Sequence, residues 1–274
     1  MRYIKTYESF SGVTTINAKI LRFEQKLESL IEKGIYEDKD SIELLEKFND
    51  IKNILSKDCS SFISELKSSG DNLLFRGVKK IREGSDSPID GLYVKTPRKN
   101  RMPLDTESNI SDMFDDDFEQ KFEIRLRSEG VFATKDPKAA STYSEYDINI
   151  KGRKSFIFFP IGDYEYFWNP NIFDLFSDIE NEEWYYGVDK DIDSLRDEYE
   201  DMYFGETPDI EFEDWLIDNK PVGPYQNVTN IVSGYVKGGL DKVKDQEITF
   251  SLNKYYIVDE KYYYLLKDWI FGEN

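Results

Sequence analysis

The sequence predicts an α+β protein in which a helical N-terminal region is followed by a longer, strand-rich region. Over residues 14–68, apolar side chains recur every three or four positions with Glu and Lys between them, as on the buried face of a helix. After residue 73, the apolar residues gather instead in short runs bounded by Gly, Pro and polar residues. Because helices and strands are segregated along the chain, α+β is favoured over alternating βαβ units.

The helical region is expected to hold two long helices and a short third one. Gly34 is a candidate for the end of the first helix, the second begins after Asp40, and the third covers residues 60–66. A cluster of small and polar residues follows and predicts a turn at which the periodicity changes. We therefore divide the chain into an N-terminal helical region, residues 1–70, and a second domain, residues 71–274.

Several apolar runs of the second domain are predicted as strands. Between two of them, Asp136 followed by Pro137 predicts the start of a helix, because Pro is favoured in the first helical turn. The last run, residues 262–270, suits either a strand or a short helix. The runs predicted as strands cover residues 73–77, 130–133, 155–160, 231–236, 247–252 and 254–258.

Charge and composition exclude several classes of function. With 55 acidic and 36 basic residues, the chain has a net charge of -19 and repels nucleic acids and anionic membranes, so we expect neither as a direct partner. The chain has no histidine, which excludes histidine-dependent catalysis, and its one cysteine, Cys59, cannot form an internal disulfide or a thiolate metal site. We therefore expect no metal site. We also expect no membrane span and no signal peptide, because no apolar run has the required length.

Residues 178–218 form an acidic segment that is also rich in aromatic residues. Seventeen Asp or Glu residues stand there against two basic ones, Lys190 and Arg196. A purely solvated loop would not carry so many Trp, Tyr and Phe side chains, so we interpret the segment as a helical insertion with buried aromatics and exposed carboxylates. A surface for a partner, or a mimic of nucleic acid, is the alternative.

Candidate functional residues lie at the borders of three apolar runs. Arg76 ends the first run and needs an anion there, whether a phosphate or one of the acidic residues, and Gly77 allows a close approach to the backbone. Thr134 follows the second run, with Tyr143 shortly after it. Asp245 and Glu247 open a late run.

On a strand, the two carboxylates of Asp245 and Glu247 would face the same side. One could stabilise positive charge on a sugar and the other could hold a nucleophile. Taken singly, each of these positions also suits an ordinary structural role.

Taken together, these positions resemble the Arg–Ser–Glu branch of the ADP-ribosyltransferase family, including transferases of tailed phages. Arg76 matches the arginine of that branch, Thr134 the centre of its Ser-Thr-Ser motif, and Asp245-Gln246-Glu247 its Glu-x-Glu motif. Residues 231–239 occupy the place of its substrate-recognition loop. The chain departs from the pattern where Ala133 and Lys135 replace the flanking serines and where Asp245 is one methylene shorter than Glu.

The resemblance implies a split β-sandwich of two short sheets that binds NAD in the cleft between them. It implies that Arg76, beside Gly77, contacts the NAD phosphates or ribose, that Thr134 orients Glu247, and that Glu247 stabilises the cation as nicotinamide leaves. Asp245 would engage the acceptor. Tyr143 resembles a nicotinamide-stacking tyrosine of the family's other branch, and Arg101, in the basic cluster at residues 98–101, is expected to contact phosphate.

The expected function is therefore mono-ADP-ribosylation of a host protein by a phage-encoded enzyme that uses NAD as its substrate. One alternative is a catalytically inactive virion or internal head protein with the same fold. The other is an acidic inhibitor of a nucleic-acid-binding host protein, acting through residues 178–218. These hypotheses place the protein in the host cytoplasm or packaged in a phage virion.

Overall fold

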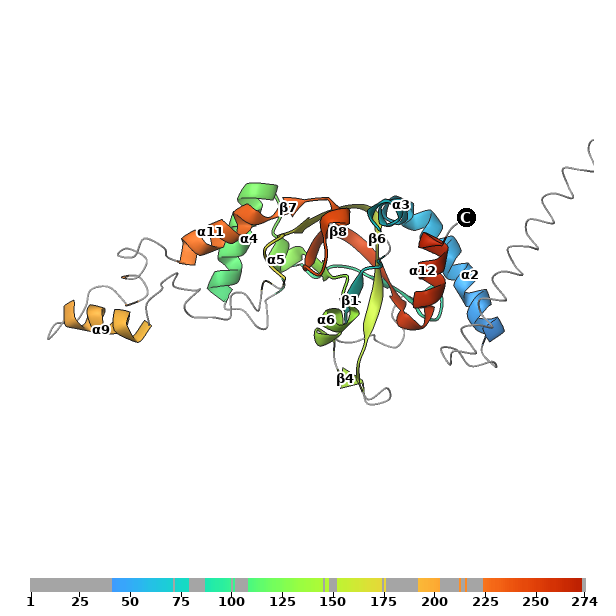
Figure 1. Cartoon of the computed structure of the whole chain (residues 1–274), viewed down its shortest axis with the longest axis horizontal. Helices are drawn as coiled ribbons and strands as arrows, with labels where there is room; N and C mark the ends of the chain where they lie inside the picture. The colour runs from blue at the N-terminus through green and yellow to red at the C-terminus, as the bar shows by residue number, and fades with distance from the viewer. Residues whose placement is uncertain are drawn as a thin grey trace, which may run out of the picture. The chain divides into compact units, whose positions relative to one another are not determined.

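The computed structural model describes residues 41–70, 72–78, 87–99, 101, 108–144, 146–147, 152–173, 175, 192–202, 212, 215 and 224–272 (Figure 1). The chain divides into two compact units, Met1–Lys52 and Asn53–Asn274, and the following description concerns the second unit. The boundary predicted near residue 70 lies inside that unit. The helices expected before residue 41 lie outside the described residues.

The described chain is α+β, as predicted, and is built on a six-stranded antiparallel sheet. The central path of the sheet is β1-β6-β8-β2, while β3 pairs with β8 and β7 pairs with β6. A separate two-stranded sheet joins β4 and β5. The strands are β1 (Phe75–Gly77), β2 (Leu92–Lys95), β3 (Val131–Ala133), β4 (Tyr146–Asp147), β5 (Gly152–Arg153), β6 (Ser155–Trp168), β7 (Val236–Lys237) and β8 (Ile248–Asp259).

The long strands β6 and β8 pair along most of their length, with an irregularity between Ile161 and Tyr164. Gly162 lies within it and has a φ of 70°, a conformation that glycine adopts without strain. On one side of the irregularity, β1 and β2 flank the pair; on the other side, β7 and β3 do so. The β6–β8 pair is therefore flanked by different strands on the two sides of the irregularity.

Helix α3 (Ser60–Ser69) covers one face of the sheet through Phe62. The Phe62 ring is fully buried and meets four rings of β6 and β8 edge to face, at centroid distances from 5.5 to 6.4 Å. The helix α2 (Ser41–Asp58) precedes it, so the helices predicted between residues 41 and 68 are confirmed. The rings around Phe62 are those of Phe158, Phe159, Tyr164 and Phe250.

A second apolar cluster joins α4 (Ser108–Phe122), α5 (Leu126–Glu129) and α11 (Pro224–Gly234) to the end of β6, and α4 and α11 lie side by side in Figure 1. The predicted strand at residues 231–236 is wrong, because most of it belongs to α11. Val228, Val232 and Tyr235 line one face at helical spacing and pack against Phe114 and Phe118.

Lys121 closes the end of α11. Its Nζ donates to the carbonyls of Val232, Ser233 and Tyr235 at 2.8 to 2.9 Å. An ammonium group in this position satisfies carbonyls that the helix leaves free at its C-terminus.

Other predicted elements have mixed outcomes. The predicted helix start is confirmed: α6 (Pro137–Thr142) begins after Asp136, whose side chain accepts from the Lys138 amide. The two C-terminal runs predicted as separate strands are one continuous strand, β8. Residues 262–270 are mostly helical, in α12 (Tyr263–Phe271), which follows a short 3₁₀ turn, η3 (Glu260–Tyr262).

The acidic segment contains a helix, α9 (Ile192–Met202). Its Tyr199 is buried and packs against the rings of Phe212 and Trp215, while Asp197 and Glu200 are exposed. A helix with buried aromatics and exposed carboxylates is what the sequence predicted for this part. Most of the remainder of residues 178–218 lies outside the described residues.

Candidate functional site

The strand register brings the ends of β1, β3 and β8 together. Ala133, the last residue of β3, pairs with Ile248, the first residue of β8, so Thr134 and Glu247 each lie one residue beyond this pair. Thr134 also forms a bridge with Phe75 of β1, with N–O distances of 2.7 and 3.0 Å. Arg76 follows Phe75 directly. Three positions that are far apart in the sequence therefore meet at one point of the sheet.

Arg76 points its guanidinium towards aromatic side chains and a main-chain carbonyl. Its Nη1 donates to the Phe132 carbonyl at 2.5 Å, and its Cζ lies 5.5 Å from the centre of the Tyr255 ring. Its Nε is buried and has no hydrogen-bond partner among the described residues. Within the same residues, no carboxylate forms an ion pair with Arg76, so the structural alternative of an acidic partner finds no support there.

Two further arginines surround the Phe132 ring. The Cζ atoms of Arg101 and Arg127 lie 4.6 and 5.4 Å from the ring centre. Arg101 is tied to the start of α5, because its amide donates to the Ser128 carbonyl at 3.0 Å and its Nη2 donates to the Arg127 carbonyl at 3.2 Å. Guanidinium groups over an aromatic face are favourable contacts and fix the position of the cations. We call Arg76, Arg101 and Arg127 the arginine cluster.

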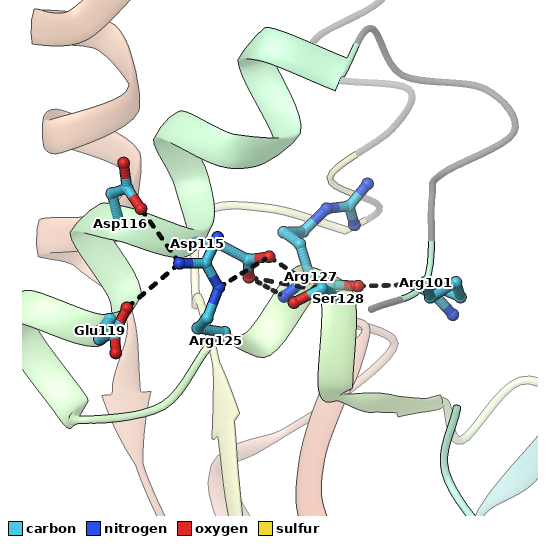
Figure 2. Close-up of polar contacts among 7 residues, drawn as sticks. All are labelled: Arg101, Asp115, Asp116, Glu119, Arg125, Arg127 and Ser128. Carbon is cyan, nitrogen blue, oxygen red and sulfur yellow. Dashed lines mark hydrogen bonds and ion pairs between the residues drawn. The ribbon is translucent and has the colours of Figure 1, made fainter. Parts of the chain in front are cut away.

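Asp115 of α4 holds the arginine-bearing segment in place (Figure 2). Its side chain is 1% exposed and accepts hydrogen bonds from the Arg127 amide at 2.7 Å and the Ser128 amide at 3.1 Å. These are amides of the first turn of α5, which otherwise has no side-chain cap. The carboxylate therefore sets the position from which the Arg127 side chain extends.

Arg125, and not the arginine cluster, neutralises the acidic stretch of α4. Its Nη1 lies 3.3 Å from both the Asp116 and the Glu119 carboxylates, and its Nε lies 3.9 Å from that of Asp115. Figure 2 shows the Arg127 guanidinium directed away from these three carboxylates. These three carboxylates of α4 are therefore paired with Arg125.

The charges of the cluster act on one another. Burial, followed by the positive charges of Arg127 and Arg76, lowers the pKa of Arg101 to about 10, with a smaller contribution from Arg98. The Glu247 carboxylate acts in the opposite direction. Arg127 and Arg76 thus act on Arg101 more strongly than Glu247 does, and a bound anion would act in the same direction as Glu247.

The two predicted carboxylates lie in different environments. β8 begins at Ile248, so Asp245 and Glu247 precede the strand and the alternation expected of a strand does not apply to them. Asp245 is exposed, whereas Glu247 is half-buried beside the arginine cluster. The Glu247 amide donates to the Phe173 carbonyl at 2.9 Å, which fixes its main chain.

Thr134 is 7% exposed, and its hydroxyl oxygen accepts from the Asp136 amide at 3.2 Å. Gly77 allows α6 to pack closely: a Cβ atom at this position would lie 2.1 Å from the Ala140 carbonyl oxygen and 2.9 Å from the Tyr143 Cβ. It is therefore α6 that approaches the backbone closely at Gly77. Tyr143 follows the end of α6 and is 42% exposed.

The structure adds Arg127, Phe132 and Tyr255 to the residues chosen from the sequence. Arg127 is 8% exposed, although Arg125, Ser128 and Glu129 lie beside it in the sequence. Nothing in this polar stretch marks Arg127 as a buried residue. Phe132 and Tyr255 gave no signal either, because aromatic residues in strands are usually core residues.

Comparisons with protein-family models, with curated proteins and with solved structures found no match to this chain. None of the helices in the described part of the chain combines the length and the apolar character that a membrane span requires.

Proposed function

We propose that the protein is a mono-ADP-ribosyltransferase that consumes NAD and modifies a protein acceptor, with a phage-encoded enzyme acting on a host protein as the biological setting. The observation that carries the proposal is the meeting of Arg76, Thr134 and Glu247 at the ends of β1, β3 and β8. These are the positions at which the chain resembles the Arg–Ser–Glu branch of the transferase family.

The arginine cluster suits the pyrophosphate of NAD. Three guanidinium groups offer fixed, planar pairs of N–H donors, which match phosphate oxygens. Burial and the neighbouring charges of Arg127 and Arg76 lower the pKa of Arg101, and the Nε of Arg76 is buried; both features suit a site for an anion. Phe132 and Tyr255 add flat apolar surfaces next to these charges.

Glu247 is the residue that we assign to the chemical step. When the bond between the ribose and nicotinamide breaks, nicotinamide leaves with the bonding electrons and positive charge develops on the ribose. A half-buried carboxylate stabilises this charge more than an exposed one does, because less water screens it. Thr134, which follows the Ala133–Ile248 pair, orients Glu247, while the exposed Asp245 meets the acceptor.

We also infer that the sheet serves as the split sandwich of two short sheets that the family implies. The irregular pairing between Ile161 and Tyr164, and the different flanking strands on its two sides, support a division at this point. The residues assigned to NAD come from β1 on one side and from β3 and the start of β8 on the other.

Release of nicotinamide from NAD, with and without candidate acceptor proteins, tests the proposal. Glu247→Gln should keep the fold and lower turnover by about 100-fold or more, as expected when a charge that acts in the transition state is removed. Glu129→Gln, which changes an exposed carboxylate of α5, is the matched control and should be neutral. Nicotinamide release by Glu247→Gln at the wild-type rate would contradict the proposed role. Failure of the wild type to bind millimolar NAD would favour the inactive virion protein instead.

A further inference from the structure

The segment between β7 and β8 carries Asp245 and Glu247 but has little regular structure of its own. It begins with Gly238 and Gly239, both with positive φ, passes through the 3₁₀ turn η2 (Leu240–Lys242) and then runs to β8. We call residues 238–247 the approach segment. A short segment without a ladder of hydrogen bonds keeps its position only through contacts with its surroundings.

Strand β6 holds the first part of the approach segment. The Trp168 Nε1 donates to the Gly238 carbonyl at 2.8 Å, and the Gly238 amide donates to the Tyr166 carbonyl at 3.1 Å. The Tyr166 hydroxyl accepts from the Leu240 amide at 3.0 Å and donates to the Glu65 carboxylate of α3. Helix α3 is thus linked to the start of the segment.

Lys135 holds the middle of the approach segment from the opposite side. Its Nζ donates to the Leu240 carbonyl at 3.1 Å and to the Val243 carbonyl at 2.7 Å, and so spans η2. Charged donors make stronger hydrogen bonds than neutral ones, and an ammonium group favours the carbonyl end of a helical turn. A serine, as in the Ser-Thr-Ser motif, is too short to make both contacts.

Lys135 is also the residue next to Thr134. The backbone of Thr134 is fixed by its bridge to Phe75, and Ala133 before it pairs with Ile248. The ammonium of Lys135 therefore ties the approach segment to the end of β3, directly beside Thr134. A shift of the segment would move Glu247 relative to the arginine cluster, whose members lie on other elements.

We propose that Lys135 is a positioning residue, which fixes the approach segment through the Leu240 and Val243 carbonyls and so sets Glu247 for the chemical step. The catalytic part of this inference depends on the proposed function. A misplacement of about 1 Å can reduce the rate about 100-fold without affecting ground-state binding. Loss of the ammonium should therefore lower kcat and leave NAD affinity unchanged.

The test compares Lys135→Met, which keeps the length but removes the donors, with Lys135→Arg, which keeps charged donors. Lys135→Met should lower kcat about 10- to 100-fold, with the KM for NAD within about twofold of wild type, and Lys135→Arg should recover most of the loss. Lys138→Met, at an exposed position on α6, is the matched control. A kcat unchanged by Lys135→Met, or a loss of NAD affinity equal to the loss of kcat, would overturn the proposal.

Hydrogen exchange separates this inference from the proposed function. In Lys135→Met, the amides of Val243 and Glu247 should exchange about tenfold faster, whereas the amide of Phe158, which bonds the Leu74 carbonyl, should not change. If the wild type does not turn over NAD but these amides still respond, the proposed function fails and the positioning role of Lys135 remains. Unchanged exchange at both amides overturns the positioning role whether or not the wild type is active.

Discussion

Removing Arg101 should stabilise the folded protein while weakening its binding of anions. The lowering of the Arg101 pKa to about 10 corresponds to a penalty on the charged form of about 3 kcal/mol. Against this, Arg101→Gln loses a charged hydrogen bond to the Arg127 carbonyl, of about 1.5 kcal/mol, and a contact with the Phe132 ring, of about 0.5 kcal/mol. The expected result is a net gain of about 1 kcal/mol, or roughly 2–4 °C in Tm.

The size of this stabilisation depends on pH and on salt concentration. The folded protein releases the Arg101 proton near pH 10, whereas the unfolded chain keeps it to a higher pH, so the penalty is fully present below about pH 10. The advantage of Arg101→Gln should be constant between about pH 6 and about pH 9. It should shrink in about 1 M NaCl, where the screening length falls to about 3 Å.

Urea unfolding of the wild type and of Arg101→Gln measures the difference directly. Arg125→Gln is the matched control of opposite sign, because Arg125 contacts three carboxylates and its loss should destabilise by about 0.5–1 kcal/mol. If Arg101→Gln destabilised the protein by more than about 1 kcal/mol, the charged Arg101 would stabilise the fold on balance, and the argument for an anion site would fail.

Three further predictions follow from the contacts described. Asp115→Ala leaves two amides of α5 without their acceptor and should destabilise by about 2 kcal/mol in urea unfolding; a change below about 0.5 kcal/mol would show that α5 needs no cap. Phe62→Ala should cost about 3–5 kcal/mol because its ring is fully buried on the sheet, and an unfolding midpoint unchanged from wild type would contradict the docking of α3. Pyrophosphate affinity should hold up to about pH 9 and fall as the pH rises through about 10, where Arg101 loses its charge; affinity that still held at about pH 11 would exclude Arg101 from the site.

Local features of the fold could be predicted from the sequence, and features that depend on packing could not. The helix start at Asp136 and Pro137 is encoded in adjacent residues, and the structure has it. Val232 and its apolar neighbours favoured a strand, because a short β-branched run does not distinguish a strand from a buried helix. Two features favour the helix α11: the spacing of Val228 and Val232, and the apolar face of α4 against which they pack. The contact with α4 cannot be recognised in the apolar run itself.

The candidate site shows the same division. Arg76 could be singled out because a positive charge at the end of an apolar run needs an explanation, and Arg101 because it belongs to a basic cluster in an acidic chain. Arg127 joins them only because Asp115, twelve residues earlier, fixes the start of α5, and no local pattern encodes such a contact. Likewise, Lys135 looked like a departure from a serine motif, whereas the structure gives it two carbonyls more than one hundred residues away.

Calorimetric titration with NAD tests the central claim most directly, namely that the arginine cluster and Glu247 form one site for this molecule. The wild type should bind NAD, and Arg76→Gln should weaken the affinity at least about tenfold, which corresponds to the loss of one charged hydrogen-bonding group. The unfolding midpoint of Arg76→Gln, measured in parallel, establishes that the variant is folded. Absence of binding by the wild type at millimolar NAD, or equal affinity of a folded Arg76→Gln, would contradict the claim.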